Sequence, residues 1–225
     1  MTWDDINVFQ YQGLYKLFNE KEKLTDDQFI LGLAAICTNK TENELKSLPF
    51  YQYEKIVEGL GFVNEQIPSV TVSHINVNGK RYRCVYDVRN MPAARYIESK
   101  HYALDVIPNL HKLMATMVIP QRKGWMGWRD DKYDASKHSE YSEDFLQVKI
   151  THVLGSVVFF YQIFRNWIRS SQGYLIREMV KTGMTMDEAI LGYISLCDIM
   201  DGFIKPNWLP NMSESAWKKH LKFQR

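Results

Sequence analysis

The sequence predicts a mainly α-helical protein with one β-hairpin, an α+β fold built as a helical bundle around a central apolar helix. Three observations support this prediction. Capping-box patterns at Thr25, Thr41 and Thr185 each precede a stretch with helical character. An Asn-Gly pair at residues 78–79 separates two alternating runs, which is the strongest short hairpin signal. An apolar stretch at residues 150–164 has the length and composition of a buried helix.

The acidic N-terminal part is expected to consist of short helices. Apolar residues at helical spacing predict a helix over residues 8–18, and the first two capping boxes open two more. Leu48-Pro49 ends the third of these, because proline lacks a backbone N–H and restricts the residue before it. A fourth helix is predicted over residues 50–60.

The hairpin is predicted over residues 70–88, with β-branched residues alternating before the turn and Lys80–Tyr86 after it. Two strands alone are marginally stable. We therefore expect the hairpin to pack on helices or on a strand of a partner.

The rest of the chain alternates between helical and irregular patterns. A loop of about twenty residues is predicted over 120–142, and loops of that length are commonly functional. An extended tail follows residue 205, with a last short basic helix around Trp217. The helices are predicted at about residues 93–100, 105–119, 143–170 and 185–201.

The 225 residues correspond to one domain or two small ones at about 150 residues per domain. With 45% hydrophobic residues the chain can bury a core, which excludes wholesale disorder. Residues 1–65 hold six Lys/Arg against eleven acids, so their net charge is −5 and the remainder carries +7. We expect an acidic helical subdomain at 1–66, and at 67–225 the β-hairpin with a helical domain that bears the long loop and the basic tail.

No residue pattern points to a known chemistry, and the prediction is that the protein is not an enzyme. The six histidines lack metal-ligand spacing and the three cysteines lack CxxC spacing, so neither a metal nor another cofactor is expected. There is no phosphate-binding glycine motif. The alternative is a small enzyme whose site gathers His111, Asp130, Asp134 and His138.

The loop and the tail hold the residue types that dominate binding surfaces, since Trp, Arg and Met are enriched at protein interfaces. Basic residues interleaved with aromatics also suit single-stranded nucleic acid, which is the less favoured partner here. A third interpretation has Trp125 and Trp128 folding back onto the core. The predicted protein-binding residues are Arg122, Lys123, Trp125, Met126, Trp128, Arg129, Trp208 and Trp217.

Four segments within about the first 120 residues resemble tail-assembly-chaperone and related virion morphogenesis proteins of tailed bacteriophages. One is the opening Thr2-Trp-Asp-Asp-Ile6 before an aromatic helix, and another is Ile36–Pro49, a helix end, a Thr-Glu-rich cap and a Leu-Pro break. The others are Arg95-Tyr-Ile97 and Asn109-Leu-His-Lys-Leu113.

The resemblance implies a non-enzymatic role in binding other virion or tail proteins, either as an assembly chaperone or as a ring, neck or baseplate component. Homo- or hetero-oligomers are then expected, in the host cytoplasm during assembly and in the virion if the protein stays there. The cysteine usage also favours a reducing cytoplasm. No membrane partner is expected, because the uninterrupted apolar stretch is well short of the roughly 20 residues of a spanning helix.

Overall fold

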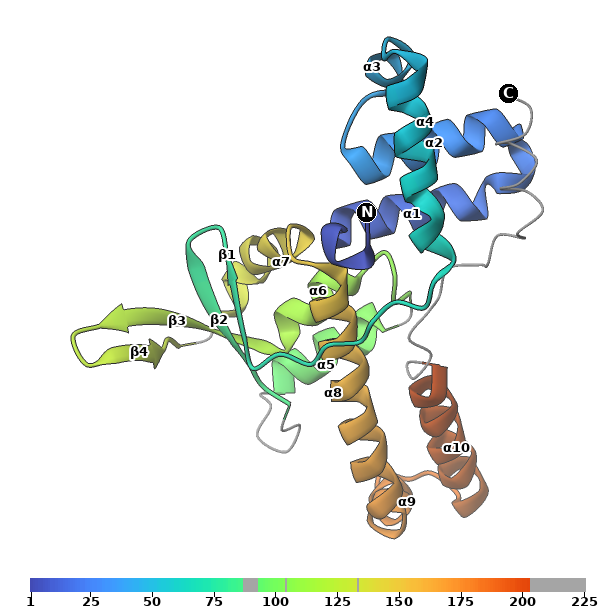
Figure 1. Cartoon of the computed structure of the whole chain (residues 1–225). Coiled ribbons are helices and arrows are strands. Elements are labelled where there is room, and N and C mark those ends of the chain that lie inside the picture. The colour runs from blue at the N-terminus through green and yellow to red at the C-terminus, as the bar shows by residue number, and fades with distance from the viewer. Residues whose placement is uncertain (87–92, 104, 133, 203–225) are drawn as a thin grey trace.

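The computed structural model describes residues 1–225 except 87–92, 104, 133 and 203–225 (Figure 1). It confirms the predicted class, since the chain is mostly helical and carries one small antiparallel sheet. The sheet has four strands in the order β1-β2-β3-β4, two more than the sequence predicts.

The N-terminal part folds as four short helices. The predicted capping boxes form at α2 and α3, where Thr25 and Thr41 each exchange hydrogen bonds with the residue three positions on. Short 3₁₀ helices lie at Trp3–Asp5, Lys21–Lys23 and Gly59–Asn64. The α-helices are α1 (Val8–Asn19), α2 (Asp26–Thr38), α3 (Glu42–Lys46) and α4 (Phe50–Glu58).

The sheet is a meander of antiparallel strands. The predicted hairpin is confirmed as β1 (His74–Val77) and β2 (Lys80–Cys84), with Asn78 and Gly79 both at positive φ in the turn. Next to β2 lies β3 (Val118–Gly124), and next to that lies β4 (Gly127–Asp130). Tyr82 on β2 packs its buried ring against Phe145 of a helix behind the sheet.

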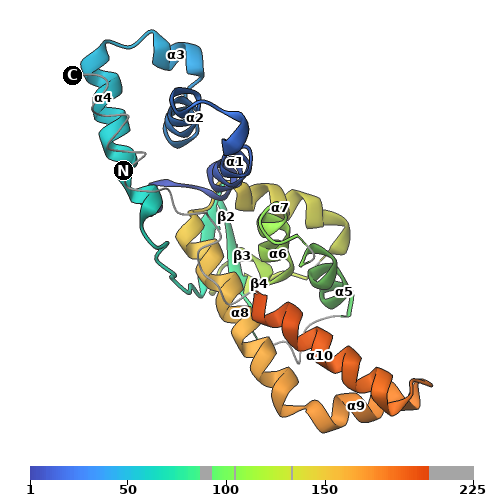
Figure 2. The same ribbon diagram turned by 90° about the vertical axis from the view of Figure 1, so that its right-hand side faces the viewer.

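The remaining helices surround and extend the core. The central one is α8, whose side facing the other elements is buried along most of its length. Figures 1 and 2 show α10 lying beside α8, with α9 between them at the end of the molecule opposite α1–α4. The bounds are α5 (Ala93–Tyr102), α6 (Leu110–Thr116), α7 (His138–Leu146), α8 (Ile150–Ser170), α9 (Gln172–Lys181) and α10 (Met186–Gly202).

One hydrophobic core runs through the described residues, from Trp3 and the N-terminal helices to α8. The N-terminus is attached to the start of α8 by backbone hydrogen bonds from Val8 N to Val148 O and from Ile150 N to Ile6 O. The division of the chain at residue 66 stays a prediction, since residues of both predicted parts belong to this one core.

The prediction of a loop over residues 120–142 is wrong. Most of that segment is β3 and β4 followed by a 3₁₀ turn and the start of α7. The predicted helix over 143–170 is divided into α7 and α8, and the helix predicted over 105–119 starts only at Leu110 and ends before Val118. Helix α9 was not expected. The predicted extended tail and terminal helix lie outside the described residues.

Candidate functional site

The most exposed feature of the sheet is its outer hairpin, which we call the arm and define as residues 118–130. Figure 1 shows the outer parts of β3 and β4 extending well beyond β1 and β2, away from the helices. All four residues of β4 are exposed, and so are Arg122 and Lys123 on β3. Within the described residues β4 pairs only with β3, so its outer backbone edge is left unpaired there.

The tip of the arm consists of Trp125 and Met126, which connect the paired residues Gly124 and Gly127. The Trp125 side chain is 90% exposed and that of Met126 is 69% exposed. Gly127 has φ +108°, a left-handed value that glycine adopts without strain. A large aromatic ring held on a tight turn in water contributes little to the stability of its own chain and is available for binding.

The outward face of the sheet places cations beside an aromatic ring. Strand alternation puts Arg81 and Arg83 of β2 on the face opposite buried Tyr82. The Arg81 guanidinium lies over the Trp128 ring, 5.2 Å from its centroid, a cation–π contact. Arg83 Nε donates to both carboxylate oxygens of Asp130 at 3.0 Å, which ties β2 to β4 across β3.

The four strands carry a strongly positive net charge. They contain six Lys/Arg and a single acid, Asp130, which gives a net charge of +5. The Arg83 guanidinium and the Gln121 amide both donate to Asp130 and hold the pKa of its carboxyl below the usual range, so this acid stays ionised. The cations are Lys80, Arg81, Arg83, Arg122, Lys123 and Arg129.

The structure thus brings six of the eight predicted binding residues onto one projecting hairpin. Arg122 and Lys123 lie on β3, Trp125 and Met126 in the turn, and Trp128 and Arg129 on β4. The interpretation in which the two tryptophans fold back onto the core is wrong, because Trp125 is almost fully exposed and Trp128 is 43% exposed. The other two predicted residues, Trp208 and Trp217, lie outside the described residues.

Sequence reasoning missed Arg81 and Arg83 as members of this surface. Their alternation with Tyr82 and Cys84 is a signal for one charged face of a strand. That signal acquires a functional meaning only when β2 pairs with β3, a contact between segments about 35 residues apart.

The four residues of the alternative enzyme site are engaged separately. Asp130 pairs with Arg83, and Asp134 accepts hydrogen bonds from the backbone and side chain of Ser136. His138 stacks on Tyr102. Among the described residues no hydrogen bond joins any two of His111, Asp130, Asp134 and His138, although the two histidines lie close enough for their charges to interact.

His111 is a buried neutral histidine. The Gln12 amide Nε2 lies 3.0 Å from His111 Nδ1, so the amide donates and the ring accepts. Burial, and to a lesser extent the charges of Lys112 and His138, lower the pKa of His111 to about 4. This pairing attaches α1 to the start of α6.

We expect His111 to make the protein acid-sensitive between about pH 6.5 and 4. Over that range the imidazole of His111 binds a proton in the unfolded chain but stays neutral in the folded chain. The free energy of unfolding therefore falls by up to about 1.4 kcal/mol for each pH unit that the pH is lowered. Urea denaturation at a series of pH values measures this slope. His111→Gln should flatten it, whereas His101→Gln, at an exposed histidine on α5, should not. An unchanged slope in His111→Gln would contradict the assignment.

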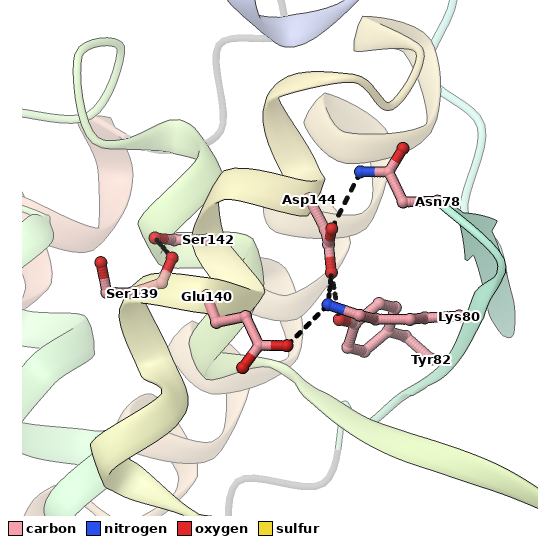
Figure 3. Close-up of polar contacts among 7 residues, drawn as sticks. All are labelled: Asn78, Lys80, Tyr82, Ser139, Glu140, Ser142 and Asp144. Carbon is pink, nitrogen blue, oxygen red and sulfur yellow. Dashed lines mark hydrogen bonds and ion pairs between the residues drawn. The ribbon is translucent and has the colours of Figure 1, made fainter.

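The base of the sheet is held by a polar cluster around Asp144 of α7 (Figure 3). The Asp144 carboxylate accepts hydrogen bonds from Asn78 Nδ2 at 2.9 Å, Lys80 Nζ at 2.9 Å and Tyr82 Oη at 2.6 Å. Lys80 also reaches Glu140 at 2.8 Å. Every donor comes from the β1–β2 hairpin, so the cluster fixes that hairpin on α7 and, through β2, supports the arm.

Two of the three cysteines are buried thiols, and no cluster of metal ligands is apparent in the part of the chain that the structure describes. Burial raises the pKa of Cys37 to about 12 and that of Cys84 to about 11, which keeps both as unreactive thiols. No group of three or more His, Cys, Asp or Glu residues is placed to hold a metal ion within the described ranges. The described helices include none with the length and hydropathy needed to cross a membrane.

A second exposed apolar surface lies on α10. Leu191 is 65% exposed, and Met186, Ile190 and Ile194 lie on the same helix with a third or more of their surface in solvent. The described residues include no element that covers this side. It serves below as a control surface for experiments on the arm.

Comparison with known proteins adds no information on function, because no family model, curated protein or solved structure matches the chain.

Proposed function

We propose that this protein has a non-catalytic role and binds a neighbouring protein subunit through the arm. The observation that carries the proposal is the 90% exposed Trp125 at the tip of a hairpin that extends beyond the body of the molecule. Burying one large aromatic side chain against a partner supplies the kind of contact that dominates binding energy at interfaces. The arginines and lysines around it select a partner surface of negative charge and accelerate the encounter.

The proposed setting is a bacteriophage virion or tail, as a structural component or as an assembly chaperone. The support for this setting is the resemblance of about the first 120 residues to virion morphogenesis proteins. Mass spectrometry of purified particles separates the two roles, because a structural component is present in the particle and a chaperone is absent. Assembly would take place in the host cytoplasm.

Cross-linking at the tip tests the proposal. A photoreactive benzoylphenylalanine replaces Met126 in cells that produce the assembly, and an equivalent probe replaces Tyr174 on α9, which is 62% exposed. We expect a discrete protein adduct from position 126 and not from position 174, identified by mass spectrometry and then confirmed with the purified partner. Absence of any protein adduct from position 126, or the same adduct from both positions, would contradict the proposal.

Trp125→Ala should separate binding from stability. With the partner purified, the affinity is expected to fall by about 30-fold or more, as for a binding hot spot. The free energy of unfolding should change by less than about 0.5 kcal/mol, because the side chain is exposed. Leu191→Ala, at an exposed apolar residue on α10, should change neither quantity. A large loss of stability without a loss of affinity would make Trp125 a structural residue.

A second candidate function is binding of single-stranded nucleic acid. The observation that favours it is the net charge of +5 on the four strands beside Trp125 and Trp128. Fluorescence anisotropy with a labelled oligonucleotide tests it, and the affinity should fall steeply as salt is added. A flat titration across salt concentration would dispose of this candidate.

A further inference from the structure

A pocket on the N-terminal helices has the features that the arm requires in a partner. It has a volume of about 300 Å³ and lies between α2, α3 and α4. This volume is at the lower end of the range for small-molecule pockets, so it suits one aromatic side chain rather than a longer segment. Its principal lining residues are Asp27, Leu31, Leu45, Leu48, Phe50 and Tyr53.

The helices around this pocket are acidic. Residues 26–58 contain six acids and three lysines, a net charge of −3. The single lysine that lines the pocket, Lys46, lies 3.1 Å from the Glu42 carboxylate, which offsets its charge. Burial and the nearby Asp27 carboxylate raise the pKa of Tyr53. The negative charge of Asp27 therefore lies close to the aromatic wall that Tyr53 forms in the pocket.

A larger pocket nearby has the wrong charge for the arm. It has a volume of about 540 Å³ and lies between α1 and α2, and its charged lining residues are Lys16 and Lys40. These lysines would repel the arginines of the arm. The α2–α4 pocket is therefore the better match.

The two surfaces are complementary but cannot meet within one molecule. Figure 1 places the tip of the arm far from α3 and α4, on a separate part of the molecule. We propose that the tip of the arm of one molecule binds the α2–α4 pocket of a second copy, with Trp125 in the pocket and the basic strands against its acidic rim. This rests on the proposed function, since it takes the arm as a protein-binding element and names its partner.

Such a contact joins two different surfaces and leaves a free pocket on one molecule and a free tip on the other. Copies therefore add head to tail and form either a closed ring or an open filament. Because opposite charges contribute to the contact, the association should weaken as salt is added.

Sedimentation velocity of the full chain, with two matched pairs of variants, tests the inference. Trp125→Ala removes the tip and Leu191→Ala is its control on α10. Phe50→Lys places a cation in the pocket, and Tyr51→Lys places the same cation on the next residue of α4, which is 59% exposed and does not line the pocket. Urea denaturation of each variant verifies that it is folded.

We expect wild type and both controls to assemble as the concentration rises toward about 100 µM, a range suited to a weak interface. Trp125→Ala and Phe50→Lys should each associate at least about 30-fold more weakly. An equimolar mixture of these two variants should form a dimer and nothing larger, since it retains one intact tip and one intact pocket. A wild-type monomer at that concentration, a mixture that fails to dimerise, or loss of assembly in Leu191→Ala would each overturn the inference.

Cross-linking through position 126 distinguishes failure of self-assembly from failure of the proposed function. A wild-type chain that stays monomeric, yet cross-links through position 126 to another identified protein, overturns self-assembly and leaves the arm as a protein-binding element. A monomer that also gives no adduct from position 126 contradicts both.

Discussion

Replacing Gly155 with alanine is expected to destabilise the protein by about 3 kcal/mol, at the upper end of the cost of overpacking a core. Gly155 lies in α8 where the segment from the N-terminal helices to β1 crosses it. A Cβ at this position would lie 2.5 Å from Val70 N and 2.6 Å from Val70 O. These are backbone atoms, and Val70 N donates to Thr151 O, so the segment cannot move aside without losing contacts.

Gly173→Ala is the matched control for this change. Gly173 is an exposed residue of α9, and a Cβ there meets nothing within 4 Å. Because alanine has a higher helix propensity than glycine, the free energy of unfolding of this variant should rise by about 0.5–1 kcal/mol. Urea denaturation of both variants measures the contrast. A neutral or stabilising Gly155→Ala would show that the crossing is not as close as the structure has it.

Asp144→Ala should cost about 3 kcal/mol, the upper end of the cost of leaving a buried hydrogen-bond donor unsatisfied, because the fully buried Tyr82 loses its acceptor. Asp144 is 6% exposed, and its carboxylate accepts three hydrogen bonds. Without it, the Lys80 ammonium and the Tyr82 hydroxyl lose their buried acceptor at the base of the sheet.

Glu140→Ala is the control, because Glu140 binds the same lysine from the same helix at 2.8 Å. Its side chain is 55% exposed, so the loss should stay below about 1 kcal/mol. Equal losses in the two variants, measured by urea denaturation, would contradict the view that burial makes Asp144 the anchor of the hairpin.

The same cluster predicts a pH dependence. Burial alone would raise the pKa of Asp144, but the hydrogen bonds from Tyr82, Asn78 and Lys80 outweigh it and hold the pKa below its usual range. The contribution to stability is therefore complete above about pH 4 and is lost as the pH falls below that value. Asp144→Asn should reduce the fall in the free energy of unfolding below about pH 4, measured by urea denaturation at a series of pH values.

Local signals were sufficient for much of the fold. The capping boxes at Thr25, Thr41 and Thr185 form as the sequence indicates, with Glu188 closing the last of them. The Asn78-Gly79 turn places β1 and β2 in register, and the apolar stretch at 150–164 lies in α8. The caps and the turn are stabilised by contacts between residues close in sequence, so a short window contains these signals. For residues 150–164 the apolar composition alone indicates a buried helix, although the elements that cover α8 are distant in the sequence.

The arm escaped prediction because its stabilising contacts are distant or weak. The turn between β3 and β4 is Trp125-Met126, which carries no Asn-Gly signal, and the strands around it are polar rather than alternating. They are held by pairing with β2 and by the link between Arg83 and Asp130, 47 positions apart. The sequence nevertheless indicates the candidate binding residues, because their composition does not depend on whether they form a loop or a hairpin.

The break between α7 and α8 also has a non-local cause. Residues 147–149 leave the helical path where Val148 O accepts from Val8 N, while Ile150 N donates to Ile6 O. These partners lie some 140 positions away in the sequence. No pattern within residues 143–170 reveals them, so one continuous helix was the natural prediction.

Hydrogen–deuterium exchange, measured on the assembled protein and on the dissociated protein, tests most directly whether the arm is the binding surface. Amides of the tip and of β4, which have solvent on their outer edge in the free chain, should exchange more slowly in the assembly. Residues of α2–α4 should be protected alongside them if the partner is a second copy, and α10 should be unchanged. An arm that exchanges equally fast in both states, with protection on α10 instead, would contradict the assignment of the arm as the site of binding.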